Sequence, residues 1–248
     1  MKKHPFLILS LIAIGVVASD SSFARKKKEY YVKSVKHDMV IPIDNDTLYK
    51  YPSVTTSVDD VVDLGLPSGT IWSICNIGAV KPEDYGYYFA WGERREKVSF
   101  DKSTYTWIDS KSKSFLKYTP ENDYRVLDSK DDAATVNWGE DWRTPTDEEI
   151  NELIDFCQYS WTEINGVKGA RFIAANGKSI FFPAAGFRIG SGVSGADSYG
   201  YYWSSSVRVG LEDYAHYLNV YSDKATNDNI DRFLGLPIRP VRKKVGQN

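Results

Sequence analysis

The stretch WTEINGVKGARFIAANGKSIFFP, from Trp161 to Pro183, decides the fold class of this chain. It contains two Asn-Gly pairs, Asn165-Gly166 and Asn176-Gly177, and this dipeptide is the strongest short-range signal for a tight hairpin turn. The runs beside these turns include Arg171–Ala174 and Ser179–Phe182, and both have the composition and spacing of strands. We therefore predict a three-stranded antiparallel meander.

One strong helix signal precedes the meander, in TPTDEEINELIDFC. Thr146 can cap the first turn while Glu149 reaches back to it, the capping-box pattern. Four apolar residues then fall at i, i+3, i+4 and i+7 on one helical face: Ile150, Leu153, Ile154 and Cys157. A second, shorter helix is predicted around Asp131–Val136.

Two further segments of the chain have patterns that favour strands. Asp213–Tyr221 alternates with period two, and Pro237–Val241 has the composition of a closing strand. The predicted strands and helices do not alternate along the chain, so parallel βαβ units are not expected. The fold class predicted is α+β, with antiparallel sheets and hairpins and one or two helices.

The first residues predict export. Lys2 and Lys3 precede the apolar run Phe6–Ala18, and the small residues Ser22 and Ala24 suit signal peptidase. The predicted organisation is a signal peptide at 1–24, an extended segment at 25–58 with one strand over Met39–Ile43, a domain at 59–243 and a tail at 244–248. The positive charges of residues 25–28 resist translocation, so an uncleaved membrane anchor is the alternative. With cleavage, we expect no transmembrane helix in the mature chain, and a location in the periplasm, at the cell surface or outside the cell.

Composition excludes some partners. The chain has 31 basic and 33 acidic residues, a net charge of -2, so it lacks the basic footprint of a nucleic-acid-binding protein. Its 14% aromatic content is that of a globular domain rather than a disordered chain.

Motifs for cofactor and metal chemistry are weak. Gly190–Gly195 reads G-x-G-x-x-G, but the residues that follow it predict a loop rather than the helix that a dinucleotide site needs. Beyond residue 24 the only histidines are His37 and His216, too few for a zinc site. No metal or cofactor is predicted, although a calcium ion held by scattered loop carboxylates stays an open alternative.

No catalytic set is predicted either. The serines Ser204–Ser206 lack the glycine frame of a nucleophile elbow, and His216 is their only available partner. A glycosidase needs two carboxylates at a set separation. The chain has many acidic residues, and its sequence does not single out two of them as a catalytic pair.

The two cysteines, Cys75 and Cys157, leave two readings. An even pair in an oxidising compartment favours a disulfide between them. The position of Cys157 on the apolar face of its helix fits two buried thiols instead.

Six blocks of the sequence, in order, resemble a large family of exported bacterial proteins, the Fibrobacter succinogenes major paralogous domain family and its Bacteroides relatives. These blocks are VDLGLPSGTIWSICNIGA (Val62–Ala79), YGYYFAWGE (Tyr85–Glu93), DDAATVNWGEDWRTPTDEEINELIDFC (Asp131–Cys157), FPAAGFR (Phe182–Arg188), YGYYWSSS (Tyr199–Ser206) and GLPIRPV (Gly235–Val241). The family is distantly similar to the C-terminal domain of the Legionella collagen-like adhesin and to the formylglycine-generating enzyme. The resemblance implies a C-type-lectin-like fold over about residues 60–243, and the family pattern usually carries cysteines at positions 75 and 157.

The copper-binding cysteine pair of the formylglycine-generating enzyme has no counterpart here, so that activity is not implied. We expect a secreted or surface-exposed, non-catalytic binding module with a glycan or protein ligand. The alternatives are an enzyme on the same scaffold, either a degenerate formylglycine-generating-enzyme-like protein or a glycan-active one, and a structural component of an envelope assembly.

The predicted binding face combines two polar segments, the glycine-rich loop Arg188–Ser198 and the turn Ser222–Arg232, because mobile loops on a rigid sheet often carry binding residues. Trp203 is expected to be core packing rather than a ligand contact. The residues predicted to bind are Arg188, Asp197, Tyr199, Tyr221, Asn227, Asp228 and Arg232, with an ordinary solvated surface as the alternative.

Overall fold

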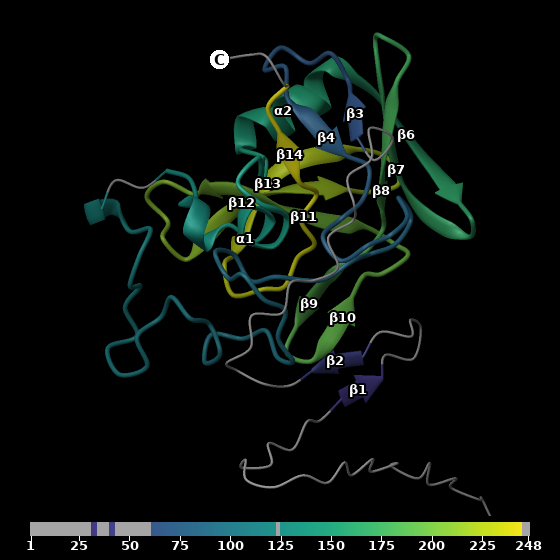
Figure 1. Ribbon diagram of the computed structural model, residues 1–248. Coiled ribbons are helices and arrows are strands. Elements are labelled where there is room, and N and C mark those ends of the chain that lie inside the picture. The colour runs from purple at the N-terminus through teal and green to yellow at the C-terminus, as the bar shows by residue number, and fades with distance from the viewer. Residues whose placement is uncertain (1–30, 34–39, 43–60, 123–124, 245–248) are drawn as a thin grey trace, which may run out of the picture. The chain divides into compact units, whose positions relative to one another are not determined.

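The structure is a computed structural model, and it describes residues 31–33, 40–42, 61–122 and 125–244 (Figure 1). The chain divides into two compact units, Met1–Tyr49 and Lys50–Asn248. In the first, β1 (Tyr31–Lys33) pairs antiparallel with β2 (Val40–Pro42), which lies within the strand predicted over Met39–Ile43. The predicted signal peptide lies outside the described residues. None of the described helices has the length and apolar character needed to cross a bilayer.

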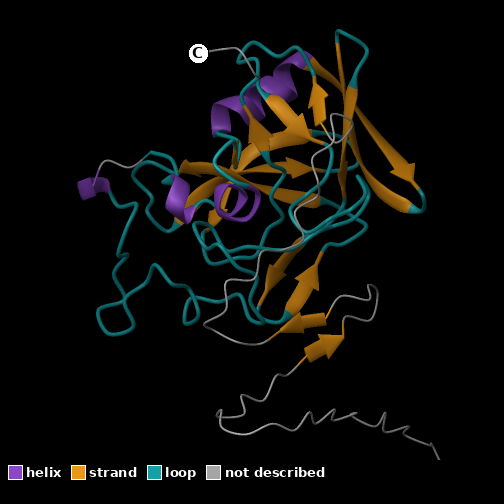
Figure 2. Cartoon of the chain, viewed as in Figure 1, coloured by secondary structure: helices purple, strands orange, loops and turns teal. Residues whose placement is uncertain are grey.

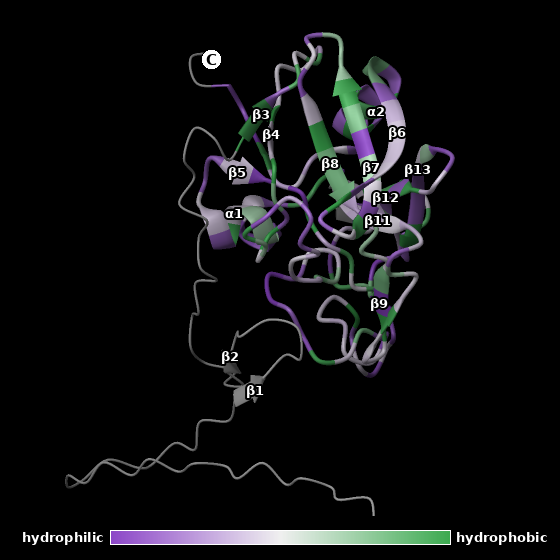
Figure 3. Ribbon diagram, turned by 90° about the vertical axis from the view of Figure 1, so that its right-hand side faces the viewer, coloured by the Kyte–Doolittle hydropathy of each residue, from purple (hydrophilic) through white to green (hydrophobic). Residues whose placement is uncertain are grey.

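Strands dominate the second unit (Figure 2), and the predicted meander is confirmed. β6 (Cys157–Ile164), β7 (Val167–Ala174) and β8 (Ser179–Pro183) form an antiparallel sheet in chain order. At the first turn Asn165 and Gly166 have φ of 49° and 86°, the left-handed backbone that tight hairpin turns use. Hydrophobic and hydrophilic residues both occur along β7, as expected for a strand with two different faces (Figure 3).

A second antiparallel sheet contains β11 (Gly200–Val207), β12 (Tyr214–Val220) and β13 (Ala225–Asp231), in that order. β12 confirms the strand predicted from the alternation in Asp213–Tyr221. β13 corrects the turn predicted over Ser222–Arg232, because seven of these residues pair with β12. Their polar side chains resemble a turn in sequence, but a complete strand beside them supplies the hydrogen bonds that make them a strand.

Short strands complete the domain. β3 (Val61–Asp63), β4 (Ile71–Ser73), β14 (Val241–Arg242) and β5 (Trp142–Arg143) form a sheet in that order. The closing strand predicted over Pro237–Val241 is therefore mostly irregular, since its two prolines cannot donate to a ladder. β9 (Phe187–Ile189) and β10 (Gly192–Ser194) form a hairpin that occupies most of the first half of Arg188–Ser198, the segment predicted to be a loop.

Both predicted helices are present. α2 (Asp147–Phe156) begins with the predicted capping box, in which Thr146 and Glu149 bond each other's backbone N–H groups. It ends one residue before Cys157, which starts β6 instead of extending the helical face. α2 packs against β12 and β13. α1 (Ala133–Trp138) is short, and the 3-10 helices η2 (Pro120–Asn122) and η3 (Ser129–Asp131) precede it.

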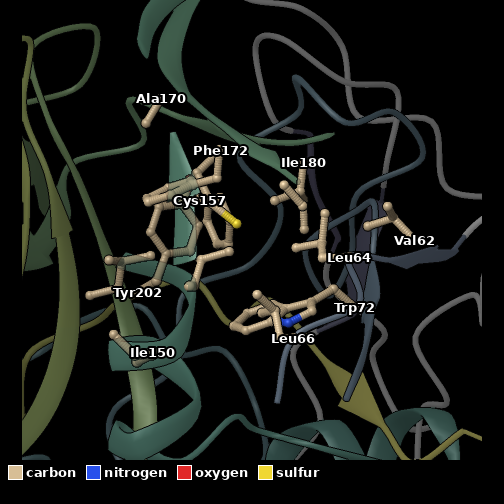
Figure 4. Close-up of a cluster of buried hydrophobic side chains, with 14 of the residues drawn as sticks. Val62, Leu64, Leu66, Trp72, Ile150, Cys157, Ala170, Phe172, Ile180 and Tyr202 are labelled. Atoms are coloured by element: carbon tan, nitrogen blue, oxygen red, sulfur yellow. The ribbon is translucent and has the colours of Figure 1, made fainter. Parts of the chain in front are cut away.

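The main core gathers Trp72, Phe172 and Tyr202 from three sheets (Figure 4), and Phe182 of β8 contacts all three. Its ring centre lies 6.0 Å from that of Trp72 in β4, 5.5 Å from Phe172 in β7 and 5.0 Å from Tyr202 in β11, all edge-on. Edge-on aromatic pairs add to the stability that burial alone gives. The described part of the chain is thus a mainly β, α+β domain built from antiparallel sheets and two α-helices.

The structure does not form the disulfide predicted between Cys75 and Cys157. Both side chains are buried, and Cys157 packs in the main core with Ile150 and Phe172. Burial raises the pKa of the Cys157 thiol, which disfavours the thiolate that disulfide exchange requires. The buried thiols of the structure match the alternative to the disulfide. Thiol labelling of the unreduced, denatured protein decides between the two, because a closed pair would leave no thiol to label.

Candidate functional site

Five aromatic side chains form a contiguous cluster over β11 and β12, which we call the tyrosine face: Phe187, Tyr199, Tyr201, Tyr217 and Tyr221. The rings of Phe187 and Tyr201 are stacked, with centres 5.2 Å apart and planes within 5° of parallel. The ring centre of Tyr201 also lies 4.9 Å from that of Tyr199 and 4.7 Å from that of Tyr217. Tyr221 closes the cluster, 5.7 Å from Tyr199. Each ring thus restrains the orientation of another.

Strand alternation explains why these tyrosines gather. In register, Tyr217 lies opposite Trp203 on one side and Asp228 on the other, and directly opposed residues share a face of the sheet. Tyr202 and Leu218 form the next row and face the main core. Period two therefore separates a core face from the tyrosine face within the same two strands.

Burial favours the neutral form of two phenols of this face, those of Tyr201 and Tyr217. The hydroxyl oxygens of Tyr201 and Tyr221 lie 3.2 Å apart. Burial first, and then this hydrogen bond, raises the pKa of Tyr201. Burial and the nearby charge of Asp228 raise the pKa of Tyr217 in the same way. Neutral phenols can both donate and accept hydrogen bonds, so the face presents both functions to a ligand.

Exposure differs across the face. Tyr217 is buried, whereas Phe187, Tyr199, Tyr201 and Tyr221 are half-buried. Asp228 in the neighbouring strand is exposed. The arrangement presents aromatic rings, phenol hydroxyls and a carboxylate together, on a support of regular strands.

Asp197 lies at the border of the tyrosine face, exposed and two residues before Tyr199. Its carboxylate accepts a hydrogen bond from the hydroxyl of Tyr85. Its own N–H donates to the carbonyl of Ala184 at 2.8 Å. Asp197 is thus anchored at both ends, and it adds a second carboxylate near the aromatic rings.

Arg232 does not belong to any binding surface, and this part of the prediction is wrong. Its side chain is 0% exposed. The guanidinium donates to the Tyr105 hydroxyl at 3.1 Å and to the carbonyls of Lys117, Tyr118 and Glu212 at 3.1, 3.3 and 2.8 Å. It also lies 4.7 Å from the ring centre of Trp91. Strand β13 ends at Asp231, so the chain turns inward there, and the next residue enters the interior.

Asn227 and Arg188 are also placed apart from the tyrosine face. Asn227 lies opposite Leu218, on the core side of the sheet, and its Nδ2 donates to the carbonyl of Asp147 at 3.1 Å in α2. Arg188 binds the segment 96–98, where its guanidinium donates to the carbonyl of Val98 at 3.2 Å and stands 5.1 Å from the ring centre of Phe100. Arg232 is buried, whereas Arg188 and Asn227 are half-buried and use their donors on the backbone carbonyls of Val98 and Asp147.

The serine block after the tyrosines is structural as well. Ser204, Ser205 and Ser206 are all buried. The N–H of Ser205 donates to the carbonyl of Pro145 at 2.7 Å, and the Ser206 hydroxyl accepts from the N–H of Asp147 at 3.1 Å. Trp203 is 1% exposed, as expected for core packing. Within the described ranges, no group of three or more His, Cys, Asp or Glu side chains is placed to hold a metal ion.

The sequence-based prediction of the site missed Phe187, Tyr201 and Tyr217. The signal was available in Asp213–Tyr221, since Tyr217 and Tyr221 are four residues apart and must share a face of a strand. Phe187 had no such signal, because its place on the face depends on the hairpin β9–β10 that was predicted as a loop.

No protein-family model matches the sequence, no curated protein matches it, and no solved structure matches the described fold. The family resemblance of the six blocks, and the C-type-lectin-like fold that it implies, therefore stay predictions.

Proposed function

We propose that the second unit is an exported, C-type-lectin-like binding module that holds a glycan on the tyrosine face. The observation that carries the proposal is the mutual contact of five aromatic rings on one side of β11 and β12, beside the exposed Asp228. Export and the C-type-lectin-like fold enter as expectations from the sequence.

The chemistry of the face suits a sugar. A sugar ring has an apolar C–H side, which packs on aromatic rings, and a rim of hydroxyls, which need donors and acceptors. The half-buried Tyr199, Tyr201 and Tyr221 offer rings and phenols, and Asp197 and Asp228 offer acceptors. Because the rings already restrain one another, little side-chain entropy is lost on binding.

An array of glycans and host proteins, probed with the purified protein, tests the proposal. We expect glycan binding that falls about ten-fold or more in Asp228→Asn, a change that removes only the charge of an exposed side chain. Tyr221→Phe should weaken binding less, since it removes one hydroxyl and keeps the ring. The matched control is Asp155→Asn on an exposed position of α2, which should bind as the parent does.

Other results would point to the alternatives. Binding to proteins alone, still sensitive to Asp228→Asn, would replace the glycan by a protein ligand. Turnover of a glycan that is lost in carboxylate variants would indicate an enzyme. Recovery of the protein at fixed stoichiometry with envelope components would indicate an assembly. Array binding that neither Asp228→Asn nor Tyr221→Phe changes would contradict the proposed face.

A further inference from the structure

Two exposed carboxylates, those of Asp228 and Asp197, accompany the tyrosine face. Asp228 accepts a hydrogen bond from the N–H of Asn229 at 2.8 Å, and Asp197 accepts one from the hydroxyl of Tyr85. Both of these donors are neutral. Among the described residues, no ion pair includes either carboxylate. The negative charge of both groups is therefore available to a ligand.

The arginine and the lysine closest in sequence to the face do not reverse this charge. Arg188 follows Phe187 directly, but its guanidinium pairs with Glu96 at 3.5 Å. Lys224 lies in the turn between β12 and β13, where the exposed Asp223 precedes it. The surroundings of the tyrosine face are thus negative, in a chain whose whole net charge is only -2.

Asp228 acts directly on the aromatic cluster. It lies opposite Tyr217 in the register of β12 and β13. Burial is the first cause that raises the pKa of Tyr217, and the charge of Asp228 is the second. The half-buried Tyr201 contacts Tyr217 from β11, on the other side of β12. Because neighbouring strands lie about 4.8 Å apart, a ligand of the size of a sugar can contact both the rings and the carboxylate.

An ammonium group suits this combination of rings and carboxylates. Its positive charge is attracted by carboxylates and by the faces of aromatic rings within about 6 Å. Its three N–H donors need acceptors, and both carboxylates and neutral phenols supply them. An acidic group on the ligand would instead be repelled by Asp228 and Asp197.

We propose that the tyrosine face selects amino sugars whose nitrogen is a protonated primary amine, a refinement that rests on the glycan function proposed above. Such a sugar has an apolar C–H side for the rings, hydroxyls for the phenols and a positive charge for the carboxylates. A neutral sugar lacks only the charge and binds more weakly. A sugar that carries a carboxylate binds most weakly.

Three trisaccharides with the same linkage test this selection, those of glucosamine, N-acetylglucosamine and glucose. They differ only at C2 of each sugar, which carries an amine, an acetamide or a hydroxyl. Binding is measured by titration calorimetry at about pH 6, below the usual pKa range of a primary amine. We expect the glucosamine trisaccharide to bind about ten-fold more tightly than the other two, and added salt should reduce this difference.

Asp228→Asn separates the selection of the amine from the binding of a sugar. It keeps the size of an exposed side chain and removes its charge. It should weaken the glucosamine trisaccharide about ten-fold and the glucose trisaccharide less than about two-fold. Asp197→Asn, which can still accept from the Tyr85 hydroxyl, should act in the same direction. Asp155→Asn, at an exposed position of α2, is the matched control and should bind as the parent does.

Several results would overturn the selection of amino sugars. One is equal or tighter binding of the acetylated or neutral trisaccharide that still falls in Tyr221→Phe, which would leave the glycan function in place. Another is a loss in Asp155→Asn as large as that in Asp228→Asn, which would assign the preference to the overall charge of the protein. A third is no binding of any trisaccharide, in which case the glycan array still decides the function. An array on which no glycan binds would overturn both proposals.

Discussion

Trp91 and Trp203 each hydrogen-bond the backbone of the segment that contains the other. The indole Nε1 of Trp203 donates to the carbonyl of Phe89 at 2.6 Å, and the Nε1 of Trp91 donates to the carbonyl of Ser204 at 2.8 Å. Both indoles are 1% exposed. Two segments that are more than a hundred residues apart in sequence are thereby fixed in register by their side chains.

The hydrogen bond of Trp203 can be measured against a matched tryptophan. Trp72 is equally buried, but its Nε1 has no partner in the described part of the chain. Trp203→Phe and Trp72→Phe lose the same ring atoms, and only the first loses a hydrogen bond. The carbonyl of Phe89 keeps its bond from the N–H of Leu236. We therefore expect Trp203→Phe to cost about 1 kcal/mol more in free energy of unfolding, measured with urea. Equal costs would mean that this bond adds no net stability.

Arg232 should behave as a core residue. Arg232→Met removes the donors to three backbone carbonyls and to the Tyr105 hydroxyl, and it should lower the free energy of unfolding by about 3 kcal/mol or more. Arg232→Lys keeps the charge but cannot reach all four acceptors, so we expect a loss of similar direction and smaller size. Urea denaturation measures both, with the exposed Arg94→Ala expected within about 0.5 kcal/mol of the parent. A parent-like stability of Arg232→Met would mean that the hydrogen bonds of this buried arginine add no net stability.

Acid should weaken the domain partly through Glu149. Burial alone would raise the pKa of this carboxyl, but the hydrogen bond and charge of Arg143, with a bond from Thr70, hold it below its ordinary value of 4.5. A carboxyl with a depressed pKa in the folded state adds stability above its unfolded pKa, and this stability is lost as the pH falls through the folded pKa.

The measurement is the free energy of unfolding of the parent and Glu149→Gln between pH 7 and pH 3. The parent should lose stability as the pH falls below about 4.5, while Glu149→Gln should be less stable at pH 7 and should lose less over the same range. Parallel curves for the two proteins would assign the acid sensitivity to other carboxyls.

Two glycines, one in the turn of the β9–β10 hairpin and one directly after it, should differ in their tolerance of alanine. Gly190 and Gly195 have φ of 54° and 73°, a backbone that costs other residues about 1–2 kcal/mol. A Cβ at Gly190 would meet open space, whereas one at Gly195 would lie 1.9 Å from the ring of Tyr199. Gly195→Ala should therefore lower the melting temperature clearly more than Gly190→Ala. Gly195→Ala should also change tyrosine fluorescence, since the ring of Tyr199 must move.

Local patterns carried most of the fold prediction. The capping box of Thr146 and Glu149 and the turn at Asn165-Gly166 act between neighbours in sequence, so their structures could be predicted from the residues alone. The strand β13 could not, because its residues adopt that structure only beside β12. The prediction that Arg232 binds a ligand failed for a related reason, since its partners Tyr105 and Tyr118 come from segments far away in the sequence.

The site was predicted only in part for the same physical reason. Tyr199, Tyr221 and Asp228 lie on or beside one face because strand alternation is a local rule. Whether an arginine points to solvent or into the interior depends on which carbonyls the tertiary fold leaves without a donor. Which carbonyls lack a donor is known only from the whole fold, and it cannot be predicted from the sequence of Arg188–Ser198 or Ser222–Arg232 alone.

The composition of β13 has a consequence for solubility. It is the last strand of its sheet among the described residues, and an edge strand can pair with the edge of another molecule and start aggregation. Its sequence, ATNDNID, is rich in Asn and Asp, which strands generally disfavour, and Asp228 presents its charge to solvent. The polar residues that disguise this strand in the sequence thus also protect the edge, because like charges and weak strand formers keep a second chain from extending the sheet.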